Sequence, residues 1–228
     1  FEKFRIKNVP DLEKLLKSGK LSKEKGWGKK TEENISRAIE VRKKFGERMP
    51  LGTAWALAET IVTALKKSKL CKKVEVAGSL RRMRDTVHDL DILITSEEPA
   101  RVIDLFTHLP MVEKIMAAGK TKATVFLSAG IEADLRVVEP ESFGAALYYF
   151  TGSKAHNVAI RTRAVQAGIT MNEYGVYKGT KAHKGKLIAA ETEKEVFKAV
   201  GLPYIEPELR EDQGEIEAAD RGELPKLI

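Results

Sequence analysis

The amino-terminal stretch of the chain carries apolar residues at helical spacing. Leu12, Leu15 and Leu16 fall on one face of a helix. Pro10 and Asp11 stand directly before them, and both residue types favour the first turn of a helix. The pattern therefore predicts a first helix that starts at these two residues.

Two further helices are predicted before the pattern changes. Residues 26–30 contain two glycines and are predicted to form a tight turn. Thr31 is predicted to cap a helix that runs to about Gly46. Residues 51–69 form the third helix, with an apolar face made of Ala54, Leu57, Ala58, Ile61 and Leu65.

The middle of the chain changes from helical spacing to alternation. The predicted strands are residues 74–77, 89–95, 124–127 and 131–138, and the last two form a hairpin that turns at 128–130. A surface helix is predicted over 100–109. A small sheet with helices beside it makes the predicted fold class α+β.

The last third of the chain returns to helical spacing. Helices are predicted at about 144–150, 154–167 and 193–200, with a loop rich in Gly and Lys at 175–186. The stretch 207–228 is rich in acidic residues and poor in apolar ones, which predicts a linker.

Composition narrows the class of protein. The 228 residues are 43% hydrophobic and 32% charged, as in globular proteins, and no apolar run reaches the length of a membrane span. The chain starts at Phe1 without a signal segment, so we expect a trimmed chain rather than a secreted precursor. The single cysteine excludes an internal disulfide and a zinc site of several cysteines, which favours a reducing, cytoplasmic setting.

The net charge of +7 is unevenly distributed. Lys and Arg outnumber Asp and Glu in the first 50 residues, whereas acidic residues dominate after residue 205. A basic front suggests a polyanionic partner, and nucleic acid is the first candidate. A solvated, lysine-rich surface is the alternative.

Two carboxylates stand two residues apart in a predicted strand. Asp89 and Asp91 therefore point to the same face of the sheet, where their charges repel each other. Divalent cations such as Mg²⁺ relieve this repulsion. Asp134 lies in an apolar strand and would complete a two-metal site suited to nucleotidyl transfer. Alternatively, Asp89 caps a strand and Asp91 is simply exposed.

A second group of residues strengthens the interpretation of the carboxylates as part of a nucleotidyl-transfer site. The strand 74–77 ends at Gly78, which lets a phosphate approach the backbone, and Ser79 can bind phosphate oxygens. An arginine such as Arg82 can bind phosphate with two hydrogen bonds. The chain contains no P-loop. Gly-Ser, then Arg, then Asp-x-Asp predicts a nucleotidyltransferase.

Four stretches in this order resemble the DNA polymerase X family, most closely its bacterial and archaeal members. They are AGSLRRMRDTVHDLDILI (77–94), ADLRVV (133–138), YFTGSKAHNVAIR (149–161) and NEYGVY (172–177). The resemblance implies a DNA-directed DNA polymerase with helical DNA-binding fingers (1–48), an α+β nucleotidyltransferase palm (49–140), an α+β thumb (141–206) and an acidic linker (207–228). It also implies that the lyase-type and histidinol-phosphatase-like domains, and the nuclease activity of the latter, are absent.

The resemblance assigns roles to single residues. Asp89, Asp91 and Asp134 would hold two divalent ions, Mg²⁺ or Mn²⁺. The residues implied around the nucleotide are Arg48, Gly78, Ser79, Arg82, His88, Tyr149, Phe150, Thr151, Gly152 and Asn157. Arg136 would lie near the active site and Arg161 would contact the template strand. The expected substrates are gapped or primed DNA and deoxynucleoside triphosphates, bound by a monomer.

The turn before the second helix resembles a helix-hairpin-helix turn, whose backbone N–H groups bind DNA phosphates. Its implied DNA contacts are Gly26, Gly28, Lys29 and Lys30. Trp27 between the glycines is interpreted as a packing anchor rather than a stacking platform for bases.

Each assignment has an alternative in ordinary protein structure. Tyr149 and Phe150 would also fit the core at a helix end, and Arg48 would fit as a cation that closes a helix. Asn157 and Arg161 share a helix face and would also fit as solvated residues.

Two positions depart from the family pattern. His88 stands where many members have Gly directly before the first metal aspartate, and Glu132 stands where some members have Arg.

The rival functions are a tailing or RNA-modifying nucleotidyltransferase and a non-catalytic DNA-binding module.

Overall fold

The computed structural model describes residues 4, 6, 9–23, 27–45, 48–180 and 184–226. The chain forms two compact units, Phe1–Glu47 and Arg48–Ile228. No helix in the described part of the chain combines the length and the apolar character needed to cross a membrane. The two units are described separately below.

The amino-terminal unit consists of α1 (Val9–Lys17), a short 3₁₀ turn η2 (Leu21–Lys23) and α2 (Lys29–Phe45). Leu16, Leu21 and Ile39 form its small buried core. The prediction that α2 starts at Thr31 was wrong by two residues. The carbonyl of Gly28 accepts the N–H group of Thr31, so Thr31 already lies inside the helix.

The second unit is built around a five-stranded mixed sheet, which confirms the predicted α+β class. Its strands are β2 (Lys73–Val76), β4 (Asp89–Thr95), β5 (Val112–Ala118), β6 (Lys122–Leu127) and β7 (Glu132–Val137). They lie in the order β2-β4-β7-β6-β5, and β4 and β7 are the one parallel pair among them. The predicted hairpin is β6–β7, whereas β5 was not predicted.

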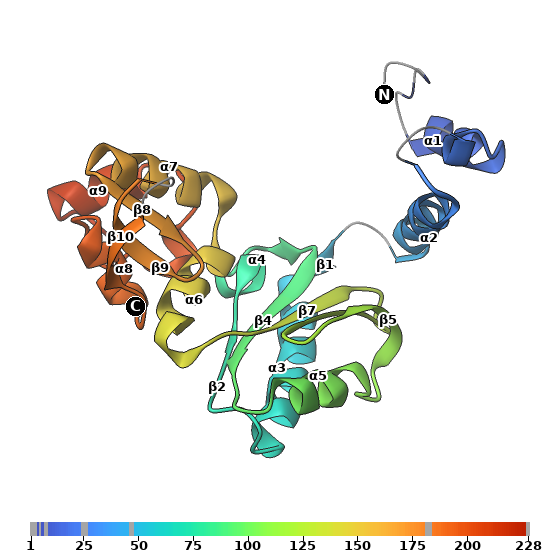
Figure 1. The fold of residues 1–228 in the computed structure, drawn as a ribbon, viewed down its shortest axis with the longest axis horizontal. Helices are drawn as coiled ribbons and strands as arrows, with labels where there is room; N and C mark the ends of the chain where they lie inside the picture. Colours follow the sequence, from blue (N-terminus) through green and yellow to red (C-terminus); the bar gives the residue numbers. More distant parts are fainter. Residues whose placement is uncertain are drawn as a thin grey trace. The chain divides into compact units, whose positions relative to one another are not determined.

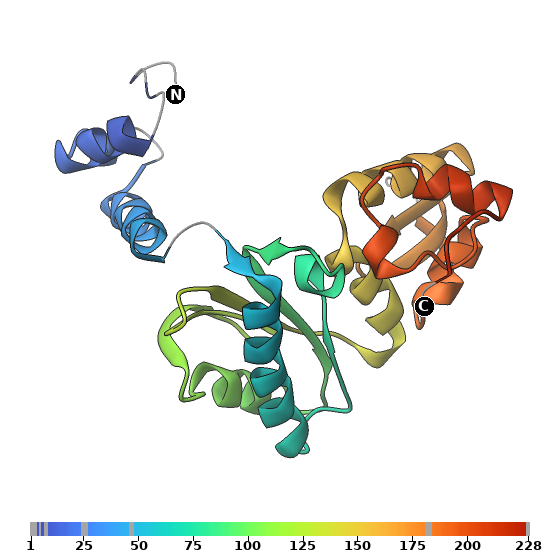
Figure 2. The same cartoon turned by 180° about the vertical axis from the view of Figure 1, so that it is seen from behind.

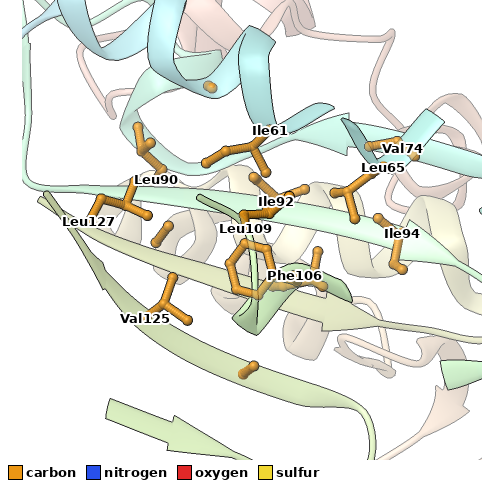
Figure 3. Packing of buried hydrophobic residues seen from close by; sticks show 14 of the residues in the cluster. Ile61, Leu65, Val74, Leu90, Ile92, Ile94, Phe106, Leu109, Val125 and Leu127 are labelled. Carbon is orange, nitrogen blue, oxygen red and sulfur yellow. The ribbon is translucent and has the colours of Figure 1, made fainter. Parts of the chain in front are cut away.

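Two helices cover one face of this sheet, α3 (Leu51–Lys67) and α5 (Pro99–Thr107) (Figures 1 and 2). Ile61 and Leu65 of α3 and Phe106 of α5 meet Leu90 and Ile92 of β4 in the main core (Figure 3). Because side chains alternate along a strand, the neighbours of these β4 residues face the opposite side.

The opposite face of the sheet is covered by α6 (Phe143–Thr151). Phe143, Ala146 and Leu147 of this helix pack with Leu93 of β4 in a separate cluster. Asp89 and Asp91 share the side of β4 that Leu93 occupies. The carboxylates therefore lie on the face toward α6, away from the main core.

After α6 the chain folds into a further helix-and-sheet region. It comprises α7 (Lys154–Gln166), β8 (Ile169–Asn172), β9 (Gly175–Gly179), β10 (Lys184–Ala189) and α8 (Glu193–Ala199). The strands lie in the order β10-β9-β8. The predicted loop over 175–186 was wrong for 175–179 and 184–186, because these residues belong to β9 and β10, which pair antiparallel, as Tyr177 does with Leu187.

Close contact between two helices depends on a single glycine. A Cβ atom on Gly144 of α6 would lie 2.3 Å from backbone atoms of Thr192, the residue that caps α8. Any larger side chain would separate the helices, because backbone atoms cannot move aside. The cluster around Tyr148, Ile160 and Phe197 forms behind this contact.

Short elements connect the sheet to its surroundings. They are β1 (Met49–Pro50), α4 (Gly78–Arg81), β3 (Thr86–Val87) and the 3₁₀ turn η3 (Pro140–Ser142). β1 pairs with β3 in an antiparallel ladder. α4 follows β2 directly, so it presents the predicted Gly-Ser-Leu-Arg stretch beside β4.

The acidic stretch after residue 205 is not a linker in its described part, which corrects the prediction. It forms the 3₁₀ turn η4 (Pro207–Leu209) and the helix α9 (Glu215–Arg221). Arg210 is fully buried, and Glu215 pairs with the buried His156 at 2.7 Å. The hydrogen bond between His156 and Glu215 and the ion pairs of Arg210 with Glu193 and of Arg82 with Glu211 hold this segment. A hydrophobicity pattern does not register such contacts.

A buried carboxylate joins three distant segments. The Oε atoms of Glu193 accept hydrogen bonds from Arg81 Nη1 and Nη2 at 2.9 and 2.6 Å, and from Arg210 Nη1 at 2.6 Å. Burial alone would raise the pKa of Glu193, but the hydrogen bonds from Arg81 and the charge of Arg210 outweigh it and lower the pKa. Arg81 also donates to Thr151 Oγ1 at 2.7 Å.

Removing the charge of Glu193 should destabilise the fold. Glu193→Gln leaves two arginines facing a neutral acceptor in a site shielded from water, so we expect the free energy of unfolding to fall by about 2–4 kcal/mol. The measurement is urea denaturation followed by circular dichroism. The control is Glu191→Gln, because Glu191 is exposed on the same stretch. Equal stability of the two variants would contradict the role given to this triad.

Candidate functional site

A hollow of about 380 Å³ opens beside the carboxylates of β4. Its walls come from α4, β4, α6 and α7. The lining residues are Gly78, Ser79, Arg82, Asp89, Asp91, Tyr149, Phe150, Thr151, Gly152, Lys154, Asn157 and Arg161. All except Lys154 were predicted from the sequence as site residues, and the fold brings them together. We call this feature the carboxylate hollow.

The third predicted carboxylate stands next to the first two. β4 and β7 run parallel, and Asp91 is the register partner of Asp134. Residues that are paired across neighbouring strands project to the same face of a sheet. The three aspartates therefore share the face toward α6, as the sequence predicted.

Gly78 makes room for Asp91. Its φ of +60° lies in the left-handed region that glycine adopts at low cost. A Cβ atom at this position would lie 2.2 Å from Asp91 Oδ2, far inside van der Waals contact. Any other residue would displace the carboxylate, so this glycine is a requirement of the aspartate beside it.

The ionised form of Asp91 is strongly disfavoured. Burial raises its pKa, and the nearby charges of Asp89 and Asp134 raise it further, to about 7. Arg136 and Lys122 act in the opposite direction but do not cancel the effect. The hollow therefore holds more negative charge than its own cations neutralise.

Asp134 is held by neighbours that the sequence analysis did not assign to it. Thr124 donates its hydroxyl hydrogen to Asp134 Oδ1. Lys122 Nζ lies 3.3 Å and Arg136 Nη2 3.9 Å from Asp134 Oδ2. Arg136 in turn lies 4.3 Å above the ring of Phe150. The carboxylate of Asp134 is thus engaged on both oxygens.

The carboxylates do not close around an ion in this conformation. Within the residues that the structure describes, no group of three His, Cys, Asp or Glu side chains is placed to hold a metal. The contacts of Asp134 with Thr124 and Lys122 give a physical reason. The donor set is nevertheless suited to a hard divalent cation, because it is made of carboxylates and Asp91 lacks a compensating charge.

Arg82 reaches the hollow with two of its nitrogens already in use. Its Nε donates to Glu211 Oε1 at 2.7 Å, and its Nη1 donates to the carbonyl of Thr151 at 2.5 Å. Both the side chain of Arg82 and that of Glu211 are mostly buried. Ser79 lies on the same short helix, so the pair can present donors to an anion.

The helix α7 contributes an amide with one free oxygen. Asn157 Nδ2 donates to the carbonyl of Tyr149 at 2.8 Å, and this bond fixes the orientation of the amide. Asn157 Oδ1 is buried and has no hydrogen-bond partner among the described residues. Arg161 Nε donates to the carbonyl of Asn157 at 3.2 Å. A buried acceptor without a partner is costly, so it marks a place where a ligand donor would be favourable.

Some predicted site residues lie elsewhere. Arg48 donates to the hydroxyl and the carbonyl of Thr86 at 2.6 and 2.5 Å and does not line the hollow. His88 is exposed and close enough to Glu132 for its charge to influence that carboxyl. Arg136 contacts Phe150 and Asp134 from β7, outside the lining of the hollow.

The predicted DNA contacts of the turn belong to the amino-terminal unit. Lys29 and Lys30 are exposed in the first turn of α2, and Gly28 directly precedes them. Trp27 is 43% exposed, which does not fit a packing anchor within the described residues. Gly26 lies outside the described residues.

Sequence reasoning missed several residues around the site. Lys122 and Thr124 alternate on β6 and face the β7 residues Arg136 and Asp134, so their period-two spacing was a usable signal. Lys154 stands two residues after Gly152, the last residue of the predicted stretch 149–152. No signal in the sequence connected Glu211 to Arg82, because 129 residues separate them.

Comparison with known proteins finds a matching family and several relatives. Residues 146–211 match the protein family described as DNA polymerase beta thumb. The chain is 36% identical over 230 residues to the DNA polymerase/3′-5′ exonuclease PolX of Bacillus subtilis (strain 168), a match that covers 100% of this chain and 40% of that protein.

Two further relatives are more distant. DNA polymerase lambda of Rattus norvegicus is 28% identical over 197 residues, which are 73% of this chain and 34% of that protein. Repair DNA polymerase X of African swine fever virus (strain Badajoz 1971 Vero-adapted) is 26% identical over 147 residues, which are 62% of this chain and 83% of that protein. The chain thus spans less than half the length of its bacterial and rat relatives.

The match of residues 146–211 to the polymerase beta thumb and the bacterial relative that covers the whole chain define the class. The chain belongs to the DNA polymerase X family.

The pKa of Asp91 predicts a pH dependence of stability in buffer that contains EDTA. The unfolded chain loses this proton near pH 4, whereas the folded chain keeps it until about pH 7. The folded state therefore binds more protons in this window, and its stability falls as the pH rises. Asp91→Asn cannot ionise, so its advantage in unfolding free energy over the unchanged chain should grow by about 2–3 kcal/mol from pH 5 to pH 8.

The measurement is urea denaturation of both proteins at several pH values. Asp85→Asn serves as the control, because Asp85 is an exposed aspartate near β3. A constant difference between Asp91→Asn and the unchanged chain across this range would show that the hollow does not perturb Asp91.

Proposed function

We propose that the chain is the nucleotidyl-transferring part of a DNA-directed DNA polymerase, which adds deoxynucleotides to a primer 3′ end and fills short gaps in DNA. One observation carries the proposal. A single hollow brings strand carboxylates with uncompensated charge to face a Gly-Ser-x-x-Arg anion site. Nucleotidyl transfer needs these two groups side by side. The names and functions of the relatives support the same reaction.

Different residues of the hollow contact the triphosphate, the sugar and the base of the incoming nucleotide. Arg82 and Ser79 hold the triphosphate, and Gly78 allows it to approach the backbone. Tyr149 and the turn after it lie beside the sugar. The free oxygen of Asn157 accepts a hydrogen bond from the base. Together these contacts orient the nucleotide before the reaction, which is the main contribution of a protein to phosphoryl transfer.

Asp89, Asp91 and Asp134 would hold the metal ions. Two divalent cations, Mg²⁺ or Mn²⁺, would activate the primer hydroxyl and neutralise the triphosphate and the pyrophosphate that leaves. The three aspartates would keep these charges at a fixed place. The repulsion among them, which contributes to the raised pKa of Asp91, would be relieved by a bound cation. When metal ions are bound, Asp134 would contact them in place of Lys122.

The proposal also assigns a polymerase subdomain to each part of the chain. Residues 49–140 would act as the palm and 141–206 as the thumb. The amino-terminal helices would bind the phosphate backbone of DNA through Lys29 and Lys30, which are exposed. The expected substrates are gapped DNA and deoxynucleoside triphosphates.

Each of the three aspartates should be essential for primer extension. Asp89→Asn, Asp91→Asn and Asp134→Asn each remove an anionic ligand, so extension of a primer on a gapped duplex should fall by at least about 10²-fold. The folding of each variant is checked by thermal melting, and Asp104→Asn, on the exposed side of α5, is the control. A variant of the three that extends primers at the normal rate would refute the assignment.

The same assay separates the rival functions. A template-directed polymerase incorporates the nucleotide that pairs with the gap, whereas a tailing enzyme extends a single strand without a template. A non-catalytic DNA-binding module would extend neither substrate. Parallel reactions with Mg²⁺ and with Mn²⁺ identify the preferred ion.

Affinity for DNA should depend on salt through the basic turn. The logarithm of the binding constant falls with the logarithm of salt concentration by roughly 0.9 per phosphate neutralised. Charge reversal of both Lys29 and Lys30 to Glu should therefore flatten the slope by about 2, measured by fluorescence anisotropy of labelled DNA. Reversal of Lys66 and Lys67, at the end of α3, is the control. An unchanged slope would place the DNA contact elsewhere.

A further inference from the structure

Arg82 is fixed from two sides by the protein. The carbonyl of Thr151 accepts from its Nη1 at 2.5 Å, and Glu211 accepts from its Nε at 2.7 Å. A guanidinium group has five N–H donors in one plane. These two contacts set the plane of the group and leave the remaining edge, which carries Nη2, for a ligand.

Glu211 approaches Arg82 from outside the carboxylate hollow. Arg82 lines the hollow, whereas Glu211 is not among the described residues that line it. The exposed fractions are 13% for the side chain of Arg82 and 19% for that of Glu211. A carboxylate in this place contacts the arginine without entering the space that a triphosphate would occupy.

The segment that carries Glu211 is itself anchored on both sides. We call residues 210–215 the strap. At one end, Ser153 N donates to the carbonyl of Arg210 at 2.9 Å, and Arg210 is tied to Glu193. At the other end, Glu215 accepts from the backbone of Asp212 at 2.8 Å and pairs with His156. Glu211 therefore sits on a segment that has little freedom to move.

The strap also reaches the turn that forms one wall of the hollow. Its bond to Ser153 and the bonds of Arg82 and Arg81 to Thr151 converge on residues 151–153. One anchored segment thus fixes both the arginine and the turn beside it. An ion pair that merely added stability would not need this connection.

We propose that Glu211 is a positioning residue, which holds the guanidinium of Arg82 so that its free edge meets the phosphates of the incoming nucleotide. The inference rests on the proposed function, because it requires a triphosphate in the carboxylate hollow. Glu211 is placed to contact neither the nucleotide nor a metal ion, and it acts through Arg82, with which it makes its short contact. Its Oε1 also lies 3.7 Å from Nε of the more exposed Arg84. The acidic segment after residue 206 is consequently part of the nucleotide site.

Two other roles make different predictions. If Glu211 competed with the triphosphate for Arg82, its removal would tighten nucleotide binding. If the pair served stability alone, its removal would lower the melting temperature and leave nucleotide binding unchanged.

The experiment compares Glu211→Gln with Glu208→Gln in the full chain. Both changes remove one negative charge from the same short stretch, but Glu208 is exposed. We measure the dissociation constant of a fluorescent deoxynucleoside triphosphate on primed DNA, the KM and kcat of extension, and the affinity for DNA. Glu211→Gln should weaken nucleotide binding and raise KM by about 5–20-fold, with kcat and DNA affinity nearly unchanged. Glu208→Gln should match the unchanged chain.

A double-mutant cycle tests whether Glu211 acts through Arg82. Arg82→Ala should weaken nucleotide binding, and adding Glu211→Gln to it should cause no further loss. Glu211→Asp keeps the charge and should recover part of the affinity. Thermal melting of every variant shows whether it is folded.

The outcomes separate this inference from the function on which it rests. An unchanged chain that binds no nucleotide overturns the proposed function and this inference with it. If the unchanged chain binds nucleotide and Arg82→Ala weakens it, but Glu211→Gln behaves like Glu208→Gln or binds more tightly, only the positioning role is overturned. An additive loss in the double variant overturns it as well.

Discussion

The carboxylate of Glu193, held between two arginines, is the interaction on which the site depends. Arg81 is adjacent to Arg82 at the end of α4, and Arg210 opens the strap. The two arginines that bind Glu193 therefore also fix the backbone segments that carry them, one on each side of the carboxylate hollow. Because buried charges are costly unless they are paired, removing one of the three residues would leave the other charges unpaired and destabilise the fold.

The alternation of β4 separates stability from chemistry. One face of this strand supplies Leu90, Ile92 and Ile94 to the main core, whereas the other presents two carboxylates to the hollow. Packing of the apolar face fixes the position of the strand. The carboxylates on the other face therefore stay close together although their charges repel each other. The repulsion contributes to the raised pKa of Asp91. The crowding is evident at the neighbouring Gly78, where there is no room for a Cβ atom. Such a conflict is expected where a ligand relieves it.

Local pattern was sufficient wherever a single strand or helix set the position of a residue. The strand at Asp89, the hairpin that carries Asp134 and the α+β class followed from alternation and turn residues. Eleven predicted residues meet in one hollow. Spacing placed Asp89 and Asp91 on one face, whereas the predicted residues of α6 and α7 came from the family resemblance. The strands β9 and β10 were missed because Gly and Lys hide their alternation. Arg48 was placed by the family resemblance at the nucleotide, although it bonds to Thr86 in this structure.

The tail after residue 205 shows why composition alone was misleading there. A stretch with many acids and few apolar residues is expected to remain solvated, since it cannot bury enough apolar surface. Here the preceding helices supply Arg82 and His156 as specific partners for Glu211 and Glu215. The two residues of each pair lie close in space but far apart in sequence. The tail is therefore complementary to Arg82, a cation, and to the buried imidazole of His156, and that complementarity cannot be seen in either segment alone.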